Sequence, residues 1–178
     1  MYALRIPKER VAVLIGKEGE TKKELEELTS TELIIDSYEG DVTLKGNDPI
    51  KLYSSREIVK AIARGFNPDI AKYLIKQDFV YEQISIKDFA KNSNHLRRLK
   101  GRVIGTEGKS RKAIEDLTEA SISVYGKTIG IIGLPENVDL ARRAIETLLS
   151  GSPHSNVYKW LEKRKKEMFK ENLEANNS

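Results

Sequence analysis

The sequence predicts an α+β protein built from two copies of one small domain, each with the element order β-α-α-β-β-α. The main observation is an internal repeat, because residues 15–29 and 104–118 align at an offset of 89 residues with eight of fifteen positions identical. The second observation is a Gly-x-x-Gly segment between two helical patterns in each copy. A period this long exceeds that of solenoid repeats, so it indicates a duplicated domain.

The first half of each copy is expected to contain one strand and two helices. Apolar residues alternate weakly at residues 2–6 and cleanly at residues 83–87, which is typical of strands. A short apolar helix then leads into each glycine segment. A second helix follows the glycines, since apolar residues recur there at the helical spacing.

The second half of each copy is expected to contain a hairpin and a third helix. Residues with high β-propensity flank a glycine-containing turn in both copies, at residues 31–44 and 121–132. A proline at position 49 or 135 starts the last helix, and a glycine near position 65 or 151 ends it.

These elements divide the chain into four segments. They are a first domain at residues 1–66, a helical linker at 67–78, a second domain at 79–152, and a C-terminal basic helix with a frayed tail at 153–178. The linker is expected to be ordered, because its Asn-Pro pair starts a short helix. In the C-terminal helix, Val157, Trp160 and Leu161 are expected to pack on the second domain, while the polar end frays.

The composition fits a globular intracellular protein. Hydrophobic residues make up 39% of the 178 residues and charged residues 33%, and the net charge of +4 favours an anionic partner only weakly. The absence of cysteine excludes disulfides, thiolate nucleophiles and cysteine zinc sites, and it fits a reducing compartment. No apolar run is long enough to cross a membrane. We therefore expect a cytoplasmic protein without a membrane partner.

The two glycine segments have the composition of a phosphate-binding turn. Glycines between two helices let backbone amides and the following helix N-terminus approach a phosphate closely. One such segment is a weak signal, because many helix connections carry two glycines. Two such segments in the same element order are a strong signal of a phosphate-binding turn. Replacing both glycines of a loop is expected to leave the fold intact, because an exposed loop buries little apolar surface.

The charge distribution favours the second copy as the nucleic-acid site. Residues 8–23 contain five basic and three acidic residues, whereas residues 97–112 contain seven basic residues and one acidic residue. Clustered positive charge around a backbone cradle favours a phosphate partner. A solvated charged surface is the alternative interpretation of such a cluster.

Apolar grooves beside the loops are expected to hold unpaired bases. They would be lined by Val13, Leu14, Ile15, Ile34 and Ile35 in the first copy and by Arg102, Val103, Ile104, Ile122 and Val124 in the second. Core packing is the alternative for each apolar member, because periodic apolar residues usually face inward.

The second glycine segment, GRVIGTEG at residues 101–108 followed by KSRKAIE, resembles the type I KH signature, and residues 12–28 resemble a more divergent copy. The fold predicted by this resemblance is two tandem type I KH domains with a short helical linker and a C-terminal helix. The chain up to about Trp160 also resembles the archaeal partner-of-Nob family of small-subunit ribosome assembly factors. That resemblance rests on ARGF at residues 63–66, AKYLI at 71–75 and LSGSP at 149–153.

The family resemblance implies a non-enzymatic protein that binds single-stranded RNA near the 3′ end of small-subunit rRNA. The implied protein partners are the endonuclease that trims the precursor there and other assembly or initiation proteins. We expect a monomer with no cofactor and no metal. The residues assigned to RNA are Gly101, Arg102, Ile104, Gly105, Thr106, Glu107, Gly108, Lys109, Ser110, Arg111, Lys112, Ile122 and Val124, with Gly16, Lys17, Gly19, Lys22, Lys23 and Ile35 in the first copy.

One departure from the KH pattern weakens the expected phosphate contacts. KH loops commonly carry basic or neutral residues between the glycines, whereas here Glu18 and Glu107 occupy one position of each loop. A carboxylate beside a phosphate is repelled unless it points outward. The first loop is expected to be weaker, because Glu20 adds another negative charge.

Three other functions compete with this interpretation. The segment GTEGKS at residues 105–110 ends like a P-loop, but the glycine that the motif requires at position 103 is a valine, and a helix instead of a strand precedes it. Another tandem-KH protein, such as a NusA-type transcription factor, would use the α-β-β-α-α-β order of type II domains. A protein-binding adaptor is the third class. His95 and His154 lack metal-ligand spacing, so we expect surface or capping roles for them.

Overall fold

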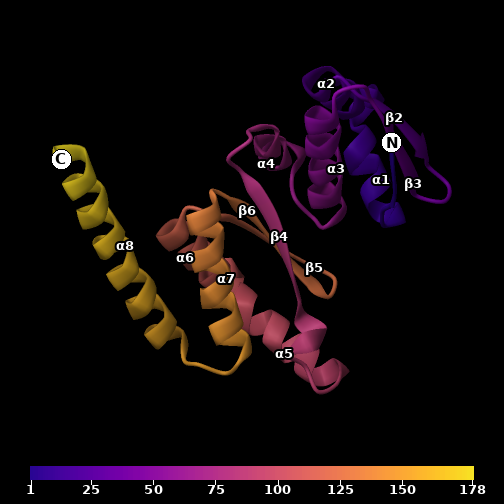
Figure 1. Cartoon of the computed structure of the whole chain (residues 1–178). Helices are drawn as coiled ribbons and strands as arrows, with labels where there is room; N and C mark the ends of the chain where they lie inside the picture. Colours follow the sequence, from indigo (N-terminus) through magenta and orange to yellow (C-terminus); the bar gives the residue numbers. More distant parts are fainter. The chain divides into compact units, whose positions relative to one another are not determined.

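A computed structural model describes all 178 residues and divides them into unit 1, residues 1–81, and unit 2, residues 82–178 (Figure 1). Each unit contains the predicted order of strands and helices, so the α+β fold with a duplicated β-α-α-β-β-α domain is confirmed. The elements of unit 1 are β1 (Tyr2–Arg5), α1 (Lys8–Ile15), α2 (Glu20–Thr29), β2 (Glu32–Asp36), β3 (Asp41–Lys45), α3 (Pro49–Ala63) and α4 (Pro68–Ala71).

Unit 1 is an antiparallel three-stranded sheet with strand order β1-β3-β2 and helices against one face. Side chains along a strand alternate between the two faces of the sheet, and the apolar ones determine which face is covered. Leu33 pairs with Leu44 in the sheet, and both side chains are buried. Asp48 caps α3 by accepting a hydrogen bond from the Ile50 N–H at 2.9 Å, and Pro49 follows as the first helical residue. The predicted start of this helix is confirmed.

The linker packs against unit 1. Helix α4 continues as a 3₁₀ turn at residues 72–75, and the side chains of Ala71 and Leu74 are buried. The Lys72 ammonium contacts the Glu24 carboxylate on α2, and this pairing raises the pKa of Lys72. The linker is therefore an ordered part of unit 1.

Unit 2 repeats the arrangement with a sheet of strand order β4-β6-β5. Asn92 caps α5 by accepting a hydrogen bond from the His95 N–H at 2.8 Å. The core contains Ile114, Ile129, Ile131 and Ile145, all fully buried. The elements are β4 (Val80–Ser85), α5 (Ser93–Ile104), α6 (Lys109–Thr118), β5 (Ser121–Tyr125), β6 (Thr128–Gly133), α7 (Pro135–Leu149) and α8 (His154–Asn177).

The first strand of the second copy lies earlier than predicted. We expected it at residues 83–87, but β4 ends at Ser85 and residues 86–88 form a 3₁₀ turn. Ile84 in β4 and Ile86 in the turn are both buried, so the apolar alternation continues past the end of the strand. This is why the sequence pattern predicted a strand at the turn. The Ile86 N–H bonds to the Lys127 carbonyl at 2.9 Å, outside the regular ladder.

Helix α8 packs on unit 2 as predicted, but it is longer than predicted. Val157 and Leu161 are buried against α6 and α7, and Trp160 is partly buried. We expected the polar end to fray, whereas the helix continues to Asn177. The local sequence is rich in Glu, Lys, Leu and Ala, whose high helix propensity supports these exposed turns.

Candidate nucleic-acid interface

Each glycine loop is a tight turn between the first two helices of its unit. Gly16 follows α1 and Gly19 precedes α2, while Gly105 and Gly108 take the same places in unit 2. In both loops the N–H of the second glycine donates to the carbonyl of the first at 3.2 Å. The first glycine has φ 76° and ψ 175° in unit 1 and φ 75° and ψ 173° in unit 2. The sequence repeat is thus a repeat of backbone geometry.

The first glycine of each loop is required by local packing. Its backbone lies in a region of φ and ψ that is almost restricted to glycine. A β-carbon at Gly16 would lie 2.7 Å from the Thr21 Cβ, and one at Gly105 would lie 2.7 Å from the Ser110 backbone nitrogen. The expectation that both glycines of a loop can be replaced without harm to the fold is therefore wrong for the first one.

The second glycine of each loop faces open space. A β-carbon at Gly19 would meet nothing within 4 Å, and one at Gly108 would meet only the Arg111 guanidinium at 3.9 Å. Both residues are in the left-handed helical region, with φ 76° and 75°. No side chain caps α2 or α6. The N–H of the first residue of each helix, Glu20 or Lys109, bonds to the Lys17 or Thr106 carbonyl. The N–H groups that follow it have no side-chain cap, and they and the positive end of the helix dipole face an anion that approaches over the second glycine.

The glutamates between the glycines lie on the outside of the loops. Glu18 and Glu107 are both exposed and both have φ 54°, which is uncommon for a residue with a side chain. Exposure lets water screen each carboxylate and lets the side chain turn away from a bound phosphate. The repulsion expected from the sequence is therefore reduced by their position.

The structure separates the basic residues of unit 2 into bound and unpaired groups. Arg102 donates to the carbonyl oxygens of Leu148 and Ser152, and Arg111 pairs with Glu115 at 2.7 Å. Both arginines therefore have structural partners. The other five basic residues between positions 97 and 112 form no ion pair and are exposed or half-buried: Arg97, Arg98, Lys100, Lys109 and Lys112.

Fewer basic residues remain unpaired beside the loop of unit 1. Arg10 donates to the carbonyl oxygens of Ile62 and Phe66 at 2.8 and 2.9 Å. Lys22 lies 3.9 Å from Glu26, and Lys8 lies over the Tyr38 ring. Lys17 and Lys23 are exposed and unpaired. The difference between the two copies thus comes to five unpaired cations against two.

Several residues that we assigned to the grooves, and Ser110, which we assigned to RNA, lie in the core instead. Leu14 and Val103 are fully buried, and Ile122 and Ser110 are only 4% and 3% exposed. Ser110 lies beneath Gly105, so its role is to shape the loop. Ile15, Ile35, Ile104 and Val124 are half-buried and Ile34 is exposed, so they remain accessible to a base.

Three basic residues of α5 belong to the basic surface beside the second glycine loop, although we did not assign them to RNA from the sequence. Arg97, Arg98 and Lys100 lie on the helix that leads into the second loop, and they are unpaired. The signal for them was present in the charge count of residues 97–112. Gly101, which we did assign, is exposed on the same helix, and a β-carbon there would meet nothing within 4 Å.

Both histidines have capping roles, as expected. His95 Nδ1 accepts the Lys91 N–H at 3.0 Å, and His154 Nε2 lies 2.8 Å from the Arg102 carbonyl oxygen. The structure contains no group of three or more His, Cys, Asp or Glu residues placed to hold a metal ion. It also contains no helix that is long and apolar enough to cross a membrane.

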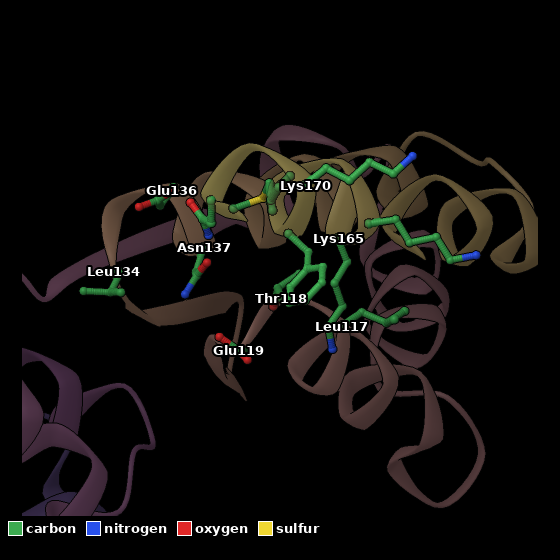
Figure 2. Close-up of a pocket in the computed structure, with 13 residues that line it drawn as sticks. Leu117, Thr118, Glu119, Leu134, Glu136, Asn137, Lys165 and Lys170 are labelled. Carbon is green, nitrogen blue, oxygen red and sulfur yellow. The ribbon is translucent and has the colours of Figure 1, made fainter. Parts of the chain in front are cut away.

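A separate pocket lies where the end of α6, the start of α7 and helix α8 meet (Figure 2). Apolar side chains such as Leu117 and Leu134 line it, together with Lys165 and Lys170. Glu119 and Glu136 also line it, so its charge is mixed. This pocket contains no residue of the glycine loop.

Two models of known families match the chain. A KH domain model matches residues 2–64, and a model described as a eukaryotic-type KH domain (KH-domain type I) matches residues 80–166. A KH domain-containing protein of Methanocaldococcus jannaschii is 48% identical over 175 residues, which cover 96% of this chain and 77% of that protein. Dim2p of Pyrococcus horikoshii has a similar structure, with a TM-score of 0.86 and 44% identity over 91% of this chain and 98% of that one.

The chain belongs to the archaeal PNO1/Dim2-type family of tandem KH-domain proteins. Eukaryotic relatives match over a shorter stretch, since the pre-rRNA-processing protein PNO1 of Coccidioides immitis is 37% identical over 109 residues. That match covers 60% of this chain and 43% of the fungal protein. The chain thus spans less than half the length of that relative. A second Pyrococcus structure, described as an a/eIF2α–aDim2p–rRNA complex, has a TM-score of 0.87 and 45% identity over 93% of this chain and 94% of that one.

The structural role of the first glycine leads to a stability prediction for this PNO1/Dim2-type protein. Gly105→Ala should lower the free energy of unfolding by roughly 3 kcal/mol, because the new methyl group meets Ser110 and the backbone is strained. Gly108→Ala should cost only about 1 kcal/mol, because it adds left-handed strain in open space. Denaturant unfolding of the full chain measures both. Equal losses would contradict the packing role of Gly105.

Proposed function

We propose that this chain is a non-enzymatic factor of small-ribosomal-subunit biogenesis that holds single-stranded rRNA near the 3′ end at the glycine loop of unit 2. The observation that carries the proposal is the uncapped start of α6 behind an open glycine, next to five unpaired cations. The relatives named for pre-rRNA processing and the Pyrococcus complex with rRNA support the choice of RNA.

The proposed contact begins at a phosphate over Gly108. Backbone N–H groups at the start of α6 donate to the phosphate oxygens, and the helix dipole favours the negative charge. Lys109 and Lys112 lie in the first turn of α6 and add positive charge. Ile104 and Val124 are half-buried and offer apolar surface to the adjacent bases.

Unit 1 is proposed to contribute less to RNA affinity. Its loop has the same backbone geometry, so a phosphate can approach Gly19 in the same way. The field there is weaker, because only Lys17 and Lys23 are unpaired while Glu18 and Glu20 are exposed nearby. Phosphate contacts dominate RNA affinity, so this difference in charge should appear as a difference in binding.

Protein partners are part of the proposal. The Pyrococcus Dim2p relative is described in a complex with a/eIF2α as well as rRNA. We infer that this chain likewise meets assembly or initiation proteins, and that an rRNA-processing endonuclease acts on the RNA that it holds. The family resemblance supports these partners.

The competing functions lack support in the geometry. Val103 lies fully buried inside helix α5, so the segment before Gly105 is not the strand and glycine-rich turn that a P-loop requires. The strand that precedes the first helix in both units differs from the type II order of NusA-type domains. The match to proteins named for pre-rRNA processing does not favour a general RNA-binding adaptor.

The proposal predicts unequal effects of one substitution placed in the two loops. Gly108→Asp should weaken RNA binding roughly tenfold or more, because it puts a negative charge at the phosphate position. Gly19→Asp should weaken it less. Both sites have the same left-handed backbone and open space, and Asp tolerates this conformation. Fluorescence anisotropy at several salt concentrations gives the affinities.

The control for this prediction is Asn at each position, which has the same size as Asp without the charge. Gly108→Asn should retain more affinity than Gly108→Asp. Thermal unfolding curves of all four variants check that the fold is kept. If the Gly19→Asp variant loses as much affinity as the Gly108→Asp variant, the two loops hold RNA jointly and the proposed asymmetry is wrong.

The identity of the RNA is tested by a crosslinking map on total cellular RNA. We expect the crosslinks of the tagged full chain to concentrate near the 3′ end of small-subunit rRNA. The Gly108→Asp variant serves as the control, because it should lose this peak while its expression is unchanged. Crosslinks spread over messenger RNA would contradict the ribosomal assignment and favour a general RNA-binding protein.

A further inference from the structure

A second basic surface of unit 2 lies beside α5, and no residue of the glycine loop lines it. It is a cleft of about 570 Å³, here named the α5–α7 cleft, between the segment that precedes α5 and the last turn of α7. Its apolar floor contains Phe89, Leu99 and Leu149. The charged and polar side chains that line it are Lys91, His95, Arg98 and Arg102, with Ser150 at the end of α7. No acidic residue lines it.

Arg102 has a structural role in this cleft. Its guanidinium donates to the carbonyl oxygens of Leu148 and Ser152 at the end of α7. Carbonyls at a helix C-terminus carry partial negative charge and would otherwise repel an anion. Arg102 therefore closes the wall of the cleft and offsets its negative end.

Lys91 and Arg98 provide the unpaired positive charge. Both side chains are exposed and neither forms an ion pair. His95 lies between them in the sequence, and its Nδ1 accepts the Lys91 N–H at 3.0 Å. A neutral His95 ring therefore carries its proton on Nε2 and is a hydrogen-bond donor there. The cleft thus combines two cations and a donor over an apolar floor.

The first copy of the domain shows that the fold does not require this charge. At the repeat offset of 89 residues, Arg98 on α5 corresponds to Glu9 on α1. Lys91 has no counterpart, because β1 ends at Arg5 and α1 begins at Lys8, whereas the segment from Ser85 to Ser93 separates β4 from α5. The arginine clamp on the third helix, in contrast, is present in both copies, since Arg10 binds the Ile62 and Phe66 carbonyls. The basic character of the α5–α7 cleft is therefore an addition to unit 2 beyond its folding.

We propose that the α5–α7 cleft binds a backbone phosphate of the same RNA strand, outside the segment held at the glycine loop. This inference rests on the proposed function of that loop. Arg98 lies seven residues before Gly105 on α5, on the order of 10 Å along the helix axis. The unpaired Lys100 and the exposed, side-chain-free Gly101 lie between them in the sequence, and the unpaired Arg97 precedes Arg98. A KH loop clamps about four nucleotides, so the cleft would hold a flanking nucleotide.

The test compares short and long RNA on the full chain. The probes are a twelve-nucleotide RNA from the 3′ end of small-subunit rRNA and a four-nucleotide RNA trimmed from it, measured by fluorescence anisotropy. Lys91→Gln with Arg98→Gln should lower affinity for the longer RNA about tenfold at moderate salt. The loss for the shorter RNA should be clearly smaller, because only the general positive field of Arg98 acts on the segment held at the glycine loop. The slope of log affinity against log salt should fall by about 0.7 for the longer RNA, since one phosphate contact is lost.

The matched control removes two exposed, unpaired lysines from α8, Lys159→Gln with Lys163→Gln. It changes the net charge by the same amount and should affect both RNAs by less than twofold. An equal loss in the α8 control would mean that the general field, not the cleft, acts on RNA. Equal losses of the cleft variant on both RNAs, or no loss on the longer one, would overturn the inference.

Failure of the proposed loop function gives a different result from failure of the cleft inference alone. If Gly108→Asp leaves binding of the four-nucleotide RNA unchanged, the glycine loop is not the RNA site and the inference falls with it. If Gly108→Asp weakens both RNAs while the cleft variant changes neither, the loop function stands and only the second phosphate site is wrong. Unfolding curves of each variant confirm that the fold is kept.

Discussion

The close packing of the first loop glycine on the second residue of the next helix is the contact on which the rest of each unit depends. Gly16 over Thr21 and Gly105 over Ser110 set how the first helix turns into the second. Because that turn is tight, the start of the second helix has no side-chain cap and faces outward past an open glycine. The open helix start that we propose as the phosphate site is thus a consequence of a packing requirement.

The difference between the two copies arises from which cations the fold uses for itself. In each unit an arginine of the first helix closes the end of the third, Arg10 in unit 1 and Arg102 in unit 2. When the cations that have such structural partners are left out, unit 2 retains five unpaired cations on α5 and α6, whereas unit 1 retains only Lys17 and Lys23 beside its loop. Similar backbone geometry with unequal free charge is what we expect when a duplicated domain keeps its fold while its two loops take different shares of RNA binding.

The sequence was sufficient for the architecture because the repeat, the glycines and the capping residues are local signals. Asp48-Pro49 marked the start of α3, and the alternation at Leu33 and Leu44 marked a buried sheet face. It was insufficient for the site, because spacing does not reveal which side of a helix faces the core. Ser110 was therefore assigned to RNA although it is buried, and Arg102 was assigned to RNA although it clamps α7. We also expected the end of α8 to fray, as chain termini often do, although its helix propensity is high and the helix continues to Asn177.

RNA binding at the glycine loop of unit 2, through the exposed amides at the start of α6, is tested most directly by NMR. The isotope-labelled full chain would be titrated with the twelve-nucleotide rRNA segment. We predict that the amide signals of residues 105–112 shift first and most, while those of residues 16–23 shift less at the same RNA concentration. Larger shifts in residues 16–23, or shifts confined to α8, would contradict this mechanism.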